Sequence, residues 1–313
     1  MVRHVIKSQM FTPELLSELF KRADEFRGIL QAGNKRDLLS ILSGLCMIYM
    51  FWEPSTRTRL SFVRAAQLLG MAVEGSENAG EFSSTIKGET LEDTIRVISS
   101  YDPDVLVMRH KLDGAAELAA QVSKVPIINA GDGRGQHPTQ ALLDFYTIQR
   151  ELRQLGGLVV VIGGDLKRGR TVRSLAYLLS KYSGNHIIFL SPLQLRVGDD
   201  IKNHLTEKGT TFEESGDVEG SLRRAHVVYW TRVQNERKVE GEEPVPDDVA
   251  ERFIIGQREM GWIPKWSILM HPLPRVNEIK GEVDADPRAA YFRQAENGLY
   301  VRMALLEWVI KGS

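Results

Sequence analysis

Hydroxyl and guanidinium side chains cluster in the segment Ser55–Thr58, directly after Pro54. Ser55 is placed to cap a helix that begins there, and the first N–H groups of a helix have no partner inside it. These N–H groups, the hydroxyls, the positive helix end and the guanidinium groups of Arg57 and Arg59 suit a tetrahedral anion. The segment predicts a phosphate site. Arginines that simply face water are the ordinary alternative at such a helix start.

Further polar side chains follow other predicted strands, and ligands of open parallel sheets bind beyond the carboxyl ends of the strands. One arginine at a strand end usually forms a surface ion pair. Several of them, together with a histidine and glutamines, indicate a cleft for anionic groups. The residues at these predicted strand ends are Arg109, His137, Gln140, Arg170, Arg232, Gln234, Leu273 and Pro274.

The segment Gly164–Thr171 follows a predicted strand and precedes a predicted helix. It matches the phosphate-binding pattern G-x-x-x-x-G-K-[ST], except that Arg170 replaces the lysine. No apolar strand ends in a clear magnesium-binding pair of aspartates, and the dinucleotide pattern G-x-G-x-x-G is absent. A nucleotide-dependent transferase is therefore a less favoured hypothesis.

Strands alternate with helices through both halves of the chain, which is typical of α/β proteins with parallel sheets. Strands are predicted at 47–51, 104–108, 125–129, 158–162, 186–190, 226–230 and 267–270. Helices are predicted at 12–32, after Ser55, after Thr90, after Pro138, at 171–182 and at 298–310. We expect two α/β domains, each a parallel sheet flanked by helices, with the active site in the cleft between them.

Composition narrows the class of protein. The chain has 313 residues, and its 40 Lys and Arg against 41 Asp and Glu give a net charge of -1, which argues against nucleic-acid binding. Cys46 is the only cysteine and the histidines lack metal-ligand spacing, so we expect no metal and no cofactor. No stretch has membrane-spanning length and no signal pattern is evident, so a cytoplasmic location is expected.

The motif Ser55-Thr56-Arg57-Thr58-Arg59 resembles the carbamoyl-phosphate motif of the transcarbamylase family, and the likeness covers nearly the full length. It is strongest to the aspartate-specific members. The ornithine-specific members typically have a cysteine in the turn formed here by residues 271–274, and Cys46 lies elsewhere. Other segments that carry the resemblance are Lys87-Gly88-Glu89-Thr90, Met108-Arg109-His110, Gly164-Asp165-Leu166-Lys167, Thr231-Arg232-Val233-Gln234 and His271 to Arg275.

The resemblance implies a carbamoyltransferase of pyrimidine biosynthesis. The carbamoyl group of carbamoyl phosphate would pass to the amine of L-aspartate, with release of phosphate; ornithine or another amino acid is the alternative acceptor. Residues 1–140 with 292–313 would bind carbamoyl phosphate, and residues 141–291 would bind aspartate.

The resemblance also implies roles for single residues. The phosphate would be held by Ser55, Thr56, Arg57 and Thr58. The carbamoyl oxygen would be polarised by Arg109, His137 and Thr58, and its amino group bound by Gln140 and the carbonyls of Pro272 and Leu273. Aspartate would be held by Lys87, Arg170, Arg232, Gln234, Leu273 and Pro274, with a cis peptide bond between Leu273 and Pro274.

Ser83 and Lys87 would come from a neighbouring subunit, because members of the family share active sites within a homotrimer. The sequence leaves open whether such a trimer joins regulatory chains or other enzymes of the pathway.

Overall fold

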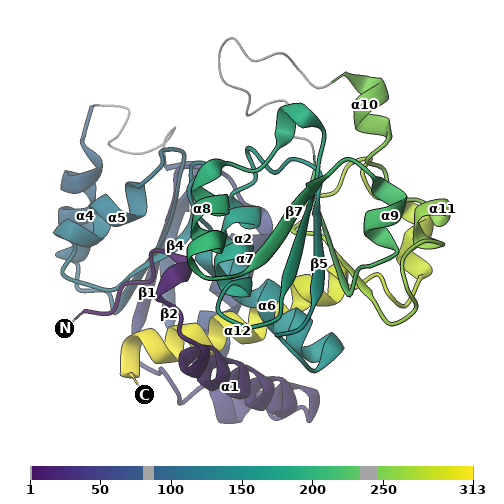
Figure 1. The fold of residues 1–313 in the computed structure, drawn as a ribbon. Coiled ribbons are helices and arrows are strands. Elements are labelled where there is room, and N and C mark those ends of the chain that lie inside the picture. The colour runs from purple at the N-terminus through teal and green to yellow at the C-terminus, as the bar shows by residue number, and fades with distance from the viewer. Residues whose placement is uncertain (1, 80–87, 233–245, 313) are drawn as a thin grey trace. The chain divides into compact units, whose positions relative to one another are not determined.

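The computed structural model describes residues 2–79, 88–232 and 246–312. The chain forms two compact units, shown in Figure 1. Unit 1 comprises Met1–Leu142 and Glu296–Ser313, and unit 2 comprises Leu143–Ala295. Each unit contains its own parallel sheet with helices, which confirms the predicted fold class.

The sheet of unit 1 has the strand order β2-β1-β3-β4, and all its neighbours are parallel. The chain adds β2 on one side of β1 and then β3 on the other, so the winding direction reverses between β1 and β3. In open parallel sheets, ligands bind at such a reversal, beyond the carboxyl ends of the two strands. The strands are β1 (Cys46–Phe51), β2 (Ala72–Glu77), β3 (Val105–His110) and β4 (Ile127–Asp132).

Capping side chains begin two of the helices in unit 1. The hydroxyl of Thr12 accepts the N–H of Leu15 at 3.2 Å, and that of Thr90 accepts the N–H of Asp93 at 3.1 Å. The second of these caps the helix that the sequence predicted after Thr90. The helices before the chain leaves this unit are η1 (Ser8–Met10), α1 (Pro13–Gln31), η2 (Lys35–Leu38), α2 (Thr56–Leu68), α4 (Leu91–Ser99), α5 (Ala115–Val122) and the start of α6 (Pro138–Leu152).

The sheet of unit 2 has the order β7-β6-β5-β8-β9 and is also parallel. Here the winding reverses between β5 and β8. The strands are β5 (Val159–Gly163), β6 (His186–Leu190), β7 (Thr211–Ser215), β8 (Val227–Trp230) and β9 (Ile268–Met270). The helices are α7 (Arg170–Leu179), η4 (Leu193–Leu195), α8 (Asp199–Glu207), α9 (Val218–Leu222), α10 (Asp247–Glu251), α11 (Gln257–Met260), η6 (Gly281–Ala285) and the start of α12 (Tyr291–Lys311).

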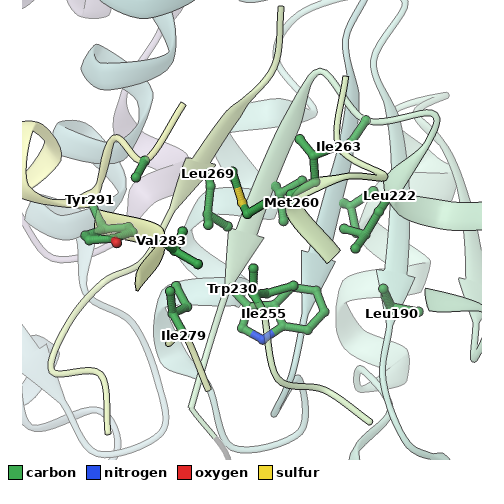
Figure 2. Packing of buried hydrophobic residues seen from close by; sticks show 14 of the residues in the cluster. Leu190, Leu222, Trp230, Ile255, Met260, Ile263, Leu269, Ile279, Val283 and Tyr291 are labelled. Carbon is green, nitrogen blue, oxygen red and sulfur yellow. The ribbon is translucent and has the colours of Figure 1, made fainter. Parts of the chain in front are cut away.

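Trp230 is a central residue of the buried hydrophobic cluster in unit 2, shown in Figure 2. Its indole Nε1 donates to the carbonyl of Phe253 at 2.8 Å, which satisfies the buried N–H group. On the neighbouring strand, a Cβ at Gly163 would lie 2.3 Å from the indole ring. Glycine at the end of β5 therefore makes room for the tryptophan at the end of β8.

The structure corrects several predicted boundaries. Strand β3 extends through Arg109, which the sequence had placed after the strand, because backbone pairing continues where the apolar run stops. The edge strands β2 and β7 were missed, since exposed edge strands have no continuous apolar run. Helix α12 begins at Tyr291, earlier than the predicted residue 298.

Candidate active site

The predicted phosphate-binding residues of unit 1 lie at one edge of its sheet. Strands β1, β3 and β4 are parallel neighbours, so their carboxyl ends face the same way. Ser55–Thr58 follow β1, Arg109 lies near the end of β3, and His137 follows β4. The tertiary structure thus brings together residues that are far apart in the chain.

Ser55 occupies the N-cap position of α2, but its side chain makes no capping hydrogen bond. The prediction that Ser55 caps the helix is therefore correct for its position and wrong for its hydroxyl group. The backbone φ of -159° and ψ of 87° place the residue outside the helix. The N–H groups of the first turn of α2 thus have no cap from this side chain.

Arg57 and Arg59 have different surroundings. Nε of Arg59 lies 2.7 Å from Oε2 of Glu77, the last residue of β2. Within the described ranges, Arg57 has no carboxylate partner. Burial by neighbouring protein atoms lowers the pKa of the Arg57 guanidinium from its ordinary value, yet an arginine remains charged at neutral pH. Its charge is therefore the one available to an anion at this helix start.

Arg109 is buried and held on two sides. Its Nη2 lies 3.2 Å from Oε1 of Glu53, and its Nη1 donates to the carbonyl of Ala130 at 3.2 Å. Glu53 follows β1 and Ala130 belongs to β4, so the strands on both sides of β3 fix the guanidinium. Glu53 was not among the predicted site residues, although a carboxylate two residues before Ser55 was a visible signal.

His137 precedes α6 and is buried. Its Nδ1 accepts the backbone N–H of Gln140 at 3.3 Å and lies 3.3 Å from the hydroxyl of Thr139. In a neutral imidazole the accepting nitrogen carries no hydrogen, so Nε2 carries it and is a donor. A donor of this kind is suited to polarising a carbonyl oxygen.

In unit 2, strands β5, β8 and β9 are neighbours, and each leads into predicted site residues. Arg170 begins α7 after β5 and is buried, Arg232 follows β8, and the turn at 271–274 follows β9. Both the N–H and the hydroxyl of Thr231 donate to the carbonyl of Gly163, at 2.8 and 2.9 Å. These bonds fix the start of the segment that contains Arg232 against the end of β5.

The turn before Arg170 contains a buried ion pair. Oδ1 of Asp165 accepts the N–H of Arg168 at 3.0 Å, and Oδ2 lies 3.5 Å from Nη1 of the same arginine. In a phosphate-binding loop the backbone N–H groups point at the phosphate. Here a carboxylate takes one of those N–H groups and brings a negative charge into the turn, which argues against the nucleotide-site hypothesis.

The turn after β9 is held by His271 and Glu278. Nδ1 of His271 accepts the N–H of Leu273 at 2.8 Å, and its Nε2 lies 2.8 Å from Oε1 of Glu278. Burial acts to raise the pKa of Glu278, but hydrogen bonds from His271 and from backbone N–H groups outweigh it and lower this pKa from its ordinary value. The peptide bond between Leu273 and Pro274 is cis, as the resemblance implied.

The described site residues therefore form two groups, one in each unit. Unit 1 contains Ser55, Thr56, Arg57, Thr58, Arg109, His137 and Gln140. Unit 2 contains Arg170, Arg232, Pro272, Leu273 and Pro274. Ser83, Lys87 and Gln234 lie outside the described residues.

Neither a metal-binding cluster nor a membrane-spanning helix is found among the described residues. They include no group of three or more His, Cys, Asp or Glu side chains that could hold a metal ion. Among the helices of these ranges, none is both long enough and apolar enough to span a bilayer.

Comparison with known proteins connects this geometry to a family. The model of the carbamoyl-phosphate-binding domain of aspartate/ornithine carbamoyltransferases matches residues 3–150, and the model of their aspartate/ornithine-binding domain matches residues 156–309. The chloroplastic aspartate carbamoyltransferase of Arabidopsis thaliana is 50% identical over 308 residues, which cover 98% of this chain and 78% of the relative. The multifunctional protein CAD of Squalus acanthias is 47% identical over 308 residues, which cover 98% of this chain and 13% of that protein.

A solved structure agrees with these sequence matches. Aspartate transcarbamoylase from Trypanosoma cruzi, in complex with carbamoyl phosphate and aspartate, superposes with a TM-score of 0.89 at 37% identity. The superposition covers 97% of this chain and 96% of that one. The resemblance found in the sequence is thereby confirmed, and the chain belongs to the aspartate/ornithine carbamoyltransferase family.

Proposed function

We propose that this chain is an aspartate carbamoyltransferase, which transfers the carbamoyl group of carbamoyl phosphate to the amine of L-aspartate. The products are N-carbamoyl-L-aspartate and phosphate. The amine nitrogen forms a bond to the carbamoyl carbon and loses a proton, while the bond from that carbon to the phosphate oxygen breaks. The similar proteins named above support this activity, and the pathway served is pyrimidine biosynthesis.

One observation carries the choice of aspartate over ornithine. Arg170 and Arg232 follow β5 and β8, which are adjacent strands at the reversal point of the unit 2 sheet. Two guanidinium groups match the two carboxylates of aspartate. Ornithine offers one carboxylate and a cationic side chain, which a second arginine would repel.

The proposed roles follow the chemistry of each group. The first turn of α2 and Arg57 bind the phosphate and stabilise its charge as it leaves. Arg109, His137 and Thr58 polarise the carbamoyl oxygen. The carbamoyl amino group is bound by Gln140 and the carbonyls of Pro272 and Leu273.

The acceptor side is proposed in the same way. Arg170 binds the α-carboxylate of aspartate, Arg232 and Gln234 bind its β-carboxylate, and Lys87, Leu273 and Pro274 complete the contacts. Residues 1–140 with 292–313 form the carbamoyl-phosphate domain, and residues 141–291 form the aspartate domain. Because both substrates are bound in contact, the reaction takes place within one complex instead of through a bimolecular encounter. This lowers the activation free energy by up to about 7–11 kcal/mol.

We also propose a homotrimer in which Ser83 and Lys87 serve the site of a neighbouring subunit. Mixing inactive Arg57→Ala subunits with inactive Lys87→Ala subunits tests this, because a shared site made of two intact halves would regain activity. Mixtures that stay inactive at a trimeric mass would contradict the sharing of sites. A cytoplasmic location stays a prediction, since the Arabidopsis relative is named as chloroplastic.

The substrate assignment is tested by supplying carbamoyl phosphate with either L-aspartate or L-ornithine. Ureido product and phosphate are measured together, so that simple hydrolysis of carbamoyl phosphate is recognised. We expect equal amounts of both products with aspartate and none above background with ornithine. Product with ornithine alone would overturn the assignment.

A further inference from the structure

Asp144 is a fully buried carboxylate in unit 2 that has no role in the activity proposed above. Its Oδ2 accepts the hydroxyl of Tyr229 at 2.8 Å, and its Oδ1 accepts Nε2 of Gln294 at 2.6 Å. Removing a carboxylate from water is costly unless hydrogen bonds replace those of the solvent. These bonds therefore fix the two side chains around Asp144.

Tyr229 and Gln294 also contact other residues. Oε1 of Gln294 accepts the backbone N–H of His271 at 2.9 Å. The Thr171 side chain is next to the Tyr229 hydroxyl and acts to lower its pKa. Burial and then the charge of Asp144 raise the pKa of Tyr229 well above its ordinary value, so its hydroxyl keeps the proton that it donates. The result is one buried chain of hydrogen bonds, Tyr229–Asp144–Gln294–His271, with Thr171 beside its tyrosine end.

Each of three segments on the aspartate side contains a member of this chain or its neighbour Thr171. Thr171 directly follows Arg170 in the first turn of α7, and Tyr229 lies on β8, three residues before Arg232. His271 directly precedes the Pro272–Pro274 segment. Each described residue that is assigned to aspartate therefore lies in or beside one of these three segments.

We propose that Asp144 is a positioning residue, which holds these three segments in the mutual arrangement that binds aspartate. The proposal rests on the function proposed for Arg170, Arg232 and the turn after β9. Asp144 touches no substrate in this role. A shift of about 1 Å in groups that position a substrate can reduce the rate by about a hundredfold, so the arrangement of the segments is a sensitive quantity.

Tyr229→Phe is the sharpest test, because it keeps the ring and removes only the hydroxyl that donates to Asp144 and lies next to Thr171. Tyr300→Phe is the matched control: its hydroxyl also donates to a carboxylate, that of Glu296 at 2.9 Å, but both residues belong to unit 1. KM for aspartate, kcat and the affinity for phosphate are measured in both variants.

We expect Tyr229→Phe to raise the KM for aspartate roughly ten- to a hundredfold, the effect of losing a hydrogen bond to a charged group, with unchanged phosphate affinity. In the control variant, neither the KM for aspartate nor the affinity for phosphate should change. An unchanged KM for aspartate in Tyr229→Phe, or an equal loss of phosphate affinity, would overturn the positioning role.

A second measurement separates this proposal from the proposed function. In Asp144→Asn, hydrogen exchange at the amide of His271 should be faster than in the wild type, because Gln294 loses the charged acceptor that fixes it. Exchange at the amide of Gln140, in unit 1, is the internal reference. Unchanged exchange at His271 would overturn the network, whereas an inactive wild type with faster exchange in the variant would overturn only the function.

Discussion

Arg59 and Glu77 form an ion pair, with Nε 2.7 Å from Oε2, that joins helix α2 to the end of strand β2. Two residues earlier on the same helix, Arg57 has no carboxylate partner within the described ranges. One short motif therefore contains an arginine with a structural role and an arginine available to a ligand. The sequence pattern treats the two alike, and the structure separates them.

Arg57→Gln and Arg59→Gln should affect different properties of the protein. We expect the first to reduce kcat/KM by roughly 10²–10³-fold, the loss typical of one donor to a developing negative charge, with little change in stability. The second removes a partly exposed ion pair and should cost no more than about 1 kcal/mol of unfolding free energy. In both variants, steady-state kinetics measures kcat/KM and urea unfolding measures the free energy of unfolding. Equal kinetic losses in the two variants would contradict the distinction.

His137→Asn should reduce kcat by roughly 10²–10³-fold, because it removes the Nε2–H donor proposed to polarise the carbamoyl oxygen. Phosphate affinity should change little, since phosphate is assigned to other residues. His186→Gln is the control: this histidine starts β6, at the amino end of that strand. If the control loses as much activity as His137→Asn, the effect on kcat does not report on the proposed site.

Gly164→Ala should destabilise the protein by about 2 kcal/mol or more, because strain and a backbone clash add together. Gly164 has φ +103, and a Cβ would lie 2.1 Å from the carbonyl oxygen of Thr231. Gly209→Ala is the control, with φ +67 and nothing within 4 Å of the added Cβ. This control should lose about 1 kcal/mol of unfolding free energy, because alanine is strained in the left-handed conformation. Urea denaturation of both variants measures the difference, and equal costs would show that the clash is relieved.

The difference in unfolding free energy between Glu278→Gln and the wild type should become smaller as the pH falls. The hydrogen bonds described above lower the folded-state pKa of Glu278 below its ordinary value of 4.5. A carboxylate of this kind stabilises the fold fully above the unfolded-state pKa, and the stabilisation is lost as the pH falls through the folded-state value. Urea denaturation at pH 7 and at several values below 4.5 measures the difference. A gap that stays constant with pH would exclude this contribution.

Much of the fold was predictable because the information is local. Buried parallel strands such as 186–190 are short, continuous apolar runs, and the structure places β6 at those residues. Pro138 and Thr90 mark helix starts through the fixed φ of proline and the acceptor oxygen of threonine. Edge strands were not predictable in this way, because β2 and β7 have no fully buried side chain and no continuous apolar run.

The partners of charged side chains were less predictable, because the contacts join residues far apart in the chain. Asp144 lies between the apolar residues Leu143 and Phe145 on α6, and nothing in that spacing indicates hydrogen bonds to Tyr229 and Gln294. The same holds for the bond between His271 and Glu278, which required the path of the turn after β9.

The sequence alone determined the alternation of strands and helices, the helix starts and the family, because these depend on residue types at short spacing. Only the tertiary structure decided the order of the strands. That order makes β1 and β3 neighbours in one sheet and β5 and β8 neighbours in the other, at the points where the winding reverses. Arg57 therefore follows a strand that adjoins the one containing Arg109, and Arg170 follows a strand that adjoins the one before Arg232. Strand order is fixed by which apolar surfaces pack together across the whole unit, and no short segment of sequence contains that information.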